Sequence, residues 1–277
     1  MTLSRWHVVT ILVAALLRAN AALAEPVGAP ALASHRAVYE LSLTRSAGIS
    51  TLASARGSIA FDFTGSACEG YIQNFRQVTE LQPSEGVAKL SDMRSATFEA
   101  GDGRDYRFKI ETKIDAAKTG DIDGKAKKAN DRQLSIDLAK PKRARIDFDG
   151  PTLFPTEHIR RILAAAREGE TIVEAKVFDG SSDGEKVFDT MTVIGKPITA
   201  AAGEKAVQID PIKTMRRWPM TISYFEPGKK DQQATYVLSL DLYDNGVSRA
   251  LKLDYGDFAL KGDMTELTLL PAKACDK

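Results

Sequence analysis

A strict alternation of apolar and polar residues runs through most of this chain and constrains its fold more than any other feature. In RDYRFKIETKI, residues 104–114, aromatic and aliphatic side chains occupy alternate positions and charged side chains lie between them. A period of two is typical of a strand with one buried and one solvated face. Residues 36–45 and 57–63 repeat the pattern. The chain is therefore expected to fold mainly into β-strands.

Further alternating stretches come in pairs joined by short polar turns. The turn Asp244-Asn245-Gly246 is a strong hairpin signal, because Asn and Gly tolerate positive φ. A dozen or more strands, mostly consecutive antiparallel pairs, predict one large sheet that is closed or strongly curled, since open sheets rarely exceed about ten strands. Residues 121–133 have no such pattern, and insertions are expected there. The later strands are expected at 133–139, 143–150, 171–180, 186–195, 234–243, 248–258 and 265–271.

One segment, FPTEHIRRILAAAREGE, has helical periodicity instead. Thr156 is its expected N-cap and Gly169 its expected stop. The apolar stripe has to be buried, and in an all-β chain the available surface is the concave face of the curled sheet. The predicted fold is therefore all-β with one amphipathic helix inside a half-barrel cup. The residues of the stripe are Ile159, Ile162, Leu163 and Ala166.

The N-terminus has the pattern of a cleaved secretory signal. Arg5 precedes an apolar core at residues 8–17, and Ala22-Leu23-Ala24 supplies the small residues of a cleavage site. The core is shorter than the roughly 20 residues that a membrane span needs. We expect residues 1–24 to be removed and residues 25–277 to form a single exported domain. The formal net charge of +1 gives no reason to expect a nucleic-acid partner.

The chain has two cysteines, Cys68 and Cys275. In an exported protein such a pair most often forms a disulfide. One alternative is a reactive Cys68 with His158 as its base, because such pairs meet in space rather than in sequence. Another is a zinc site, although the scattered histidines do not have the spacing of a zinc site.

Nothing in the sequence assembles a catalytic constellation, and no metal or cofactor is expected. The loop at 179–184 matches the first half of a calcium loop, but position 12 is Thr190 rather than Glu, so a solvated hairpin loop is favoured. The basic stretches KPKRAR and MRRW could contact anionic head groups, but solvated sheet faces are favoured. His158 could titrate within a cavity or lie at the surface.

Several stretches together resemble one family. They are SHRAVYELSLTRS, GSACEGYIQNFR, FPTEHIRRIL, VFDGSSDGEKVFDT and LYDNGVSRALKLDYGDFAL. In this order they resemble the EipB family of cell envelope integrity proteins from alphaproteobacteria. The resemblance implies a periplasmic protein folded as a long antiparallel β-spiral, curled into a cup around a helix, with one disulfide between Cys68 and Cys275. It implies no catalytic residues.

The predicted function is therefore non-enzymatic support of the cell envelope. The fold that the resemblance implies is similar to periplasmic half-barrels that bind acyl chains or peptides, although fold alone does not establish function. We expect a monomer that binds a lipid, peptide or protein partner in its cup. An enzyme acting on an envelope component and a purely structural scaffold are the alternatives. The residues expected to contact a ligand are His158, Ile159, Ile162 and Leu163.

Overall fold

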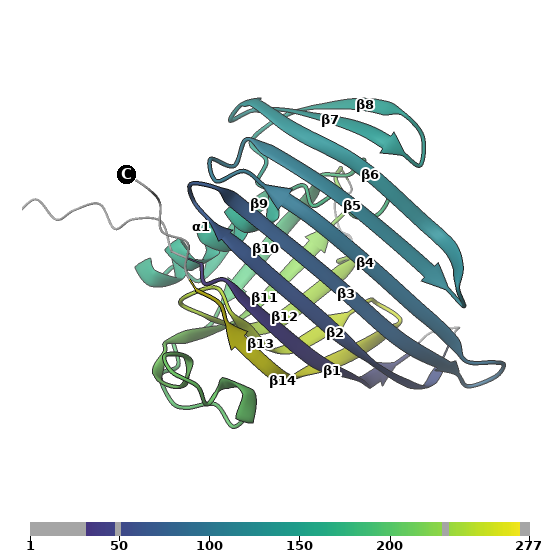
Figure 1. Cartoon of the computed structure of the whole chain (residues 1–277), viewed down its shortest axis with the longest axis vertical. Helices are drawn as coiled ribbons and strands as arrows, with labels where there is room; N and C mark the ends of the chain where they lie inside the picture. Colours follow the sequence, from purple (N-terminus) through teal and green to yellow (C-terminus); the bar gives the residue numbers. More distant parts are fainter. Residues whose placement is uncertain (1–31, 48–50, 229–232, 272–277) are drawn as a thin grey trace, which may run out of the picture.

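The computed structural model describes residues 32–47, 51–228 and 233–271. Within these ranges fourteen strands join into one sheet, which with one α-helix and two short 3-10 turns makes up the regular structure (Figure 1). The elements are β1 (His35–Ser46), β2 (Leu52–Ser66), β3 (Gly70–Pro83), β4 (Lys89–Glu99), β5 (Asp105–Ile114), β6 (Ala117–Asn130), β7 (Gln133–Lys140), β8 (Ala144–Asp149), α1 (Pro155–Glu168), β9 (Ile172–Val177), β10 (Phe188–Ile194), η1 (Lys205–Val207), η2 (Ile212–Thr214), β11 (Arg217–Phe225), β12 (Tyr236–Tyr243), β13 (Ser248–Asp254) and β14 (Phe258–Leu269).

The sheet is antiparallel and follows chain order except at one junction. Its order is β8-β7-β6-β5-β4-β3-β2-β1-β14-β13-β12-β11-β10-β9, so the first and last strands of the chain pair at its centre. The sheet edges, β8 and β9, do not pair with each other. Instead, Leu153 follows β8 and forms a parallel bridge with Val177 at the end of β9. The predicted curled antiparallel sheet is confirmed as an open half-barrel.

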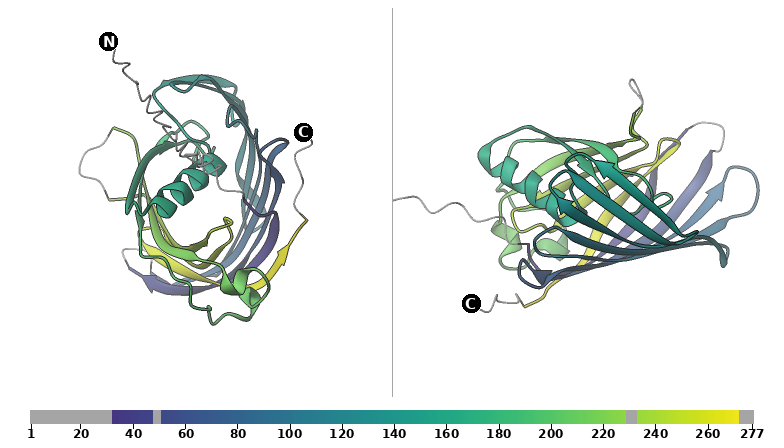
Figure 2. Two further views of the ribbon diagram at one scale, coloured as in Figure 1. Left: turned by 90° about the vertical axis from the view of Figure 1, so that its left-hand side faces the viewer. Right: turned by 90° about the horizontal axis from the view of Figure 1, so that it is seen from above.

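Helix α1 lies inside the curl of the sheet (Figure 2). Its residues Ile162 and Leu163 have 0% of their surface exposed and belong to the same apolar cluster as Trp218 and Met220 of β11. Gly169 ends the helix with φ of 82°, as predicted, because glycine adopts the left-handed conformation without steric cost. The helix begins at Pro155 with Phe154 at the N-cap position, two residues before the predicted N-cap, Thr156.

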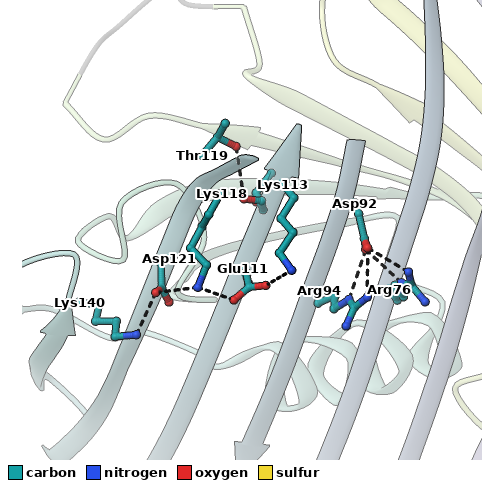
Figure 3. Close-up of polar contacts among 10 residues, drawn as sticks. Arg76, Asp92, Arg94, Glu111, Lys113, Lys118, Thr119, Asp121 and Lys140 are labelled. Atoms are coloured by element: carbon teal, nitrogen blue, oxygen red, sulfur yellow. Dashed lines mark hydrogen bonds and ion pairs between the residues drawn. The ribbon is translucent and has the colours of Figure 1, made fainter. Parts of the chain in front are cut away.

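The outer face of the sheet carries ion pairs that run across neighbouring strands (Figure 3). Arg76 and Arg94 both hydrogen-bond the carboxylate of Asp92 and hold its pKa at about 2. On the next strands, Lys118 bridges Glu111 and Asp121 at 2.6 and 3.2 Å. Exposed pairs of this kind each contribute little stability. They confirm that the charged positions of the alternating pattern face solvent.

The MRRW stretch differs from the solvated sheet face that was predicted, because its Arg217 is buried. Arg217 donates to Asp241 at 3.0 Å and to the carbonyl of Ala200, and Arg216 lies 3.3 Å from Asp244. These contacts account for the MRRW stretch as part of the packed sheet.

Strand β6 covers the segment for which the sequence predicted insertions. Its inward positions include Gly124, where an added Cβ would lie 2.6 Å from the ring of Phe108 and 2.9 Å from Leu138. Another inward position holds Lys128, which is 8% exposed. Small residues and one lysine on the buried face hide the alternation that marks the other strands.

Candidate functional site in the cup

The curled sheet and α1 enclose a cavity of about 480 Å³. This volume lies within the roughly 300–1,000 Å³ typical of small-molecule sites. A second hollow of about 530 Å³ adjoins it, since Phe61, Phe75 and Met93 line both. Most of the wall surface is apolar, but many of the lining residues have neutral hydrogen-bonding side chains. Those side chains include Gln73, Ser95, Thr97, Thr112 and Asn245.

Contacts from the sheet hold the N-terminus of α1 beside this cavity. The carboxylate of Glu99, at the end of β4, accepts hydrogen bonds from the backbone N–H groups of Thr156 at 2.7 Å and Glu157 at 2.9 Å. Lys128 of β6 donates to Glu157 at 2.5 Å, and its ammonium lies 4.5 Å from the ring centre of Phe154. A negative charge at a helix N-terminus is favourable and satisfies otherwise unpaired N–H groups. The first turn of α1 is thereby anchored to β4 and β6.

Burial raises the pKa of Glu99 to about 7, against the opposing effect of its two backbone hydrogen bonds. The folded protein therefore binds a proton that the unfolded chain, with a pKa near its ordinary value, has released. The stabilisation that the folded state gains from this proton on Glu99 is present at acidic pH and is lost as the pH rises toward 7. Two buried histidines, His35 and His158, have lowered pKa values and act in the opposite direction.

Glu99→Gln is expected to isolate the contribution of Glu99 to this pH dependence. The free energy of unfolding, measured by urea denaturation from pH 5 to 8, is compared for the wild type and the variant. The wild-type value minus the variant value should fall with rising pH, by no more than about 1.4 kcal/mol per pH unit. A difference that stays constant across this range would show that Glu99 has no raised pKa.

The structure separates the four predicted ligand-contacting residues into two pairs. His158 and Ile159 line the cavity. Ile162 and Leu163 instead pack in the apolar cluster beneath the helix and do not line it. The His158 imidazole is 2% exposed, its Nε2 lies 3.4 Å from the Thr190 hydroxyl, and burial lowers its pKa to about 4. His158 is therefore neutral at physiological pH, and ligand contact by any of the four stays a prediction.

The loop between β9 and β10 differs from the predicted solvated hairpin loop, because it packs into the cup. Gly180 and Gly184 are buried, with φ of 75° and 78°, and a Cβ on either would meet Phe108 or Ile122 within 3 Å. Ser181 lines the cavity. The loop thus connects the β9 side of the cup to the opposite wall, on β5 and β6.

The structure provides no metal centre in this loop or elsewhere in the described residues. Within them, no group of three or more metal-ligating side chains comes together. In the loop, the carboxylates of Asp179 and Asp183 instead accept hydrogen bonds from the backbone N–H groups of Ser181 and Glu185.

Cys68 lies exposed in the turn between β2 and β3 and is not among the residues that line the cavity. Its expected partner, Cys275, lies outside the described residues, as does the expected signal at 1–24. The disulfide and the signal therefore stay predictions. None of the helices in the described ranges combines the length and apolar character that crossing a bilayer requires.

The alternation placed Phe61, Phe63 and Tyr106 on the inward side, but the sequence analysis named no ligand-contacting residue on β1 to β5, whose inward faces supply much of the cavity wall. His35 is the most informative residue on these faces. It stands two positions before Ala37, which with Tyr39 forms the apolar side of the alternation in residues 36–45 and is buried. Extending the alternation by one step would have placed His35 inside the cup.

Comparisons with known proteins agree with this architecture. The chain is 36% identical over 245 residues to the cell envelope integrity protein EipB of Brucella abortus, a match that covers 86% of this chain and 84% of that protein. A crystal structure of a β-barrel-like protein of a domain of unknown function from Brucella abortus superposes with a TM-score of 0.82 at 34% identity, covering 88% of this chain and all of the other. The profile of EipB-like proteins matches residues 26–271, and the chain therefore belongs to the EipB-like family.

Proposed function

We propose that this protein is a non-enzymatic component of the periplasm that supports the cell envelope by holding the apolar part of a ligand in its cup. The observation that carries the proposal is the mostly apolar cavity of about 480 Å³ beside α1. The name of the Brucella relative supports the envelope role, and the N-terminal export pattern supports the periplasm. In this proposal the mature chain, residues 25–277, acts as a single monomeric domain.

The side chains that line the cavity are better suited to binding a ligand than to catalysis. Its two histidines are buried, and burial lowers the pKa of both. The hydroxyl in contact with His158 is that of Thr190, which already donates to the carbonyl of Ala175 at 3.0 Å. A nucleophile paired with a base would need that hydroxyl proton to face the histidine. The residues present are thus suited to hold a ligand rather than to cleave one.

Blocking the cavity tests the proposal. Ser95 lies in the wall between Phe75 and Ile110 on the neighbouring strands, whereas Ala96 lies on the opposite face of β4. Ser95→Trp should lower the affinity for the apolar fluorescent probe N-phenyl-1-naphthylamine by about tenfold or more, because the indole occupies part of the cavity and narrows the space left for the probe. Ala96→Trp, the matched control, should bind the probe as the wild type does.

The binding is followed by the rise in probe fluorescence in titrations of delipidated mature protein. Absence of saturable binding to the wild type, together with unchanged melting temperatures in the presence of acyl amphiphiles, would overturn the proposal. Equal affinities of the two variants would place the binding outside the cup.

A further inference from the structure

His35 lies in the cavity wall with its hydrogen bonding only half satisfied. Its side chain is 2% exposed and packs beside the rings of Phe61 and Phe63, with ring centres 5.4 and 6.0 Å away. Its Nδ1 lies 2.7 Å from the carbonyl oxygen of Ala33. Its Nε2 is shielded from bulk water and has no hydrogen-bond partner within the described part of the chain.

The contact with Ala33 determines what Nε2 can accept. A carbonyl oxygen only accepts hydrogen bonds, so Nδ1 has to carry the proton. Burial lowers the pKa of His35, so the ring is neutral and Nε2 keeps its lone pair. A buried acceptor without a partner is costly and is rare in folded proteins. The missing partner has to be a hydrogen-bond donor.

The rest of the cavity is unsuited to a charged group. None of the described residues that line it is a lysine or an arginine. The one acidic residue among these described residues, Asp179, has a pKa raised by burial, and its carboxylate already accepts the backbone N–H of Ser181. An anionic head group placed here would be desolvated without a countercharge, which is strongly unfavourable. The neutral amides and hydroxyls of the wall can hydrogen-bond an uncharged ligand instead.

We propose that the cavity binds an uncharged amphiphile, with a hydroxyl or amide N–H that donates to Nε2 of His35 and an acyl chain that lies against the aromatic wall. This inference rests on the proposed function and specifies its ligand class. His35 starts β1 and pairs in register with Phe63, which pairs with Gln73, whose side chain also lines the cavity. The polar part of the ligand therefore lies at this end of the strands, beside α1, and its chain extends toward Phe75 and Met93.

Three ligands with the same acyl chain test separately the two requirements of the proposal, a hydrogen-bond donor and the absence of charge. Monolauroylglycerol is uncharged and has hydroxyl donors, methyl laurate is uncharged and has none, and laurate at pH 8 is an anion. Affinities for the delipidated mature protein are measured by displacement of N-phenyl-1-naphthylamine below the critical micelle concentration of each ligand. Monolauroylglycerol should bind about tenfold more tightly than either of the others, because only it satisfies Nε2 without burying a charge.

His35→Phe should remove this preference while leaving the affinity for methyl laurate unchanged. The matched control is Thr192→Val, because the Thr192 hydroxyl is also buried without a partner but does not line the cavity. That variant should keep the tenfold preference. Should His35→Phe fail to fold, the ¹⁵N resonance of Nε2 in the wild type provides a second measurement, which should shift with monolauroylglycerol and not with methyl laurate.

The outcomes distinguish this inference from the function on which it rests. If none of the three ligands binds, both fail together. Equal binding of monolauroylglycerol and methyl laurate, or a preference that survives in His35→Phe, leaves the cup as an apolar binding site and overturns the role of His35. An Nε2 resonance that no ligand shifts would show that the ligand does not donate to this atom and would likewise overturn the role of His35.

Discussion

Leu163→Asp is expected to unfold the protein or to lower its melting temperature beyond the range of most point mutations. Leu163 is 0% exposed and belongs to the apolar cluster that joins α1 to Val173 and Trp218. Removing a buried leucine side chain costs about 2–5 kcal/mol, and the aspartate adds the desolvation of an unpaired charge. Together these terms approach the about 5–15 kcal/mol by which a typical protein is stable. Thermal unfolding followed by circular dichroism measures the effect.

Arg161→Asp is the matched control, because it introduces the same carboxylate on the exposed side of the same helix. Its melting temperature should stay within a few degrees of the wild-type value. A Leu163→Asp variant that melts like the wild type would mean that α1 does not pack inside the cup. Equal losses in both variants would instead indicate that the helix itself, rather than its docking, is sensitive to an added acid.

Much of the fold could be predicted because one face of each strand is buried. The alternation around Tyr39 and Tyr106 placed both rings inside, where they are 2% and 1% exposed. The helix was recognised from a different period and then placed on the concave face, since no other apolar surface remained. Patterns of this kind are local, and they report burial directly.

The parts that could not be predicted depend on contacts between distant segments. Gly124 and Lys128 interrupt the apolar pattern of β6, because Phe108 and Leu138 fill the space above the glycine and Glu157 pairs with the lysine. Phe108 and Leu138 lie on the neighbouring strands β5 and β7, and Glu157 lies on α1, so none of these partners is part of the pattern of β6 itself. A search for periodicity therefore reports a loop where the structure has a strand.

The N-terminus of α1 illustrates the same limit. Sequence reasoning looked for a local cap and selected Thr156, whereas the acceptor for its backbone N–H is the carboxylate of Glu99, 57 residues earlier. The loop between β9 and β10 contains the Gly, Ser and Asp residues of a solvated turn, but its two glycines allow it to approach Phe108 and Ile122 closely. In both cases the local sequence indicates the kind of structure, a helix start or a turn. Only the tertiary contacts show which distant residues it packs against.

The end of β14 lies close enough to the end of β2 for the expected disulfide to form. Leu269, at the end of β14, pairs with His35, and His35 pairs with Phe63 of β2. Because both pairings are antiparallel, β14 and β2 run in the same direction and end at the same side of the sheet. Two strand spacings, about 10 Å, separate Leu269 from Phe63. Cys275 follows six residues after Leu269, and six residues can span up to about 20 Å.

Loss of the disulfide between Cys68 and Cys275 is expected to be the largest single effect on stability that leaves the core intact. The bond would close a loop of about 200 residues, which the chain-entropy model values at about 5 kcal/mol. For a domain of this size that corresponds to about 10–20 °C in melting temperature. Cys68→Ser and Cys275→Ser should each show this loss, and the double variant should lose little more than either. Reduction of the wild-type protein should reproduce the loss, whereas reductant should leave the double variant unchanged. Mass measurement after alkylation without reductant checks the bond directly, and two modified cysteines in the mature protein would contradict it.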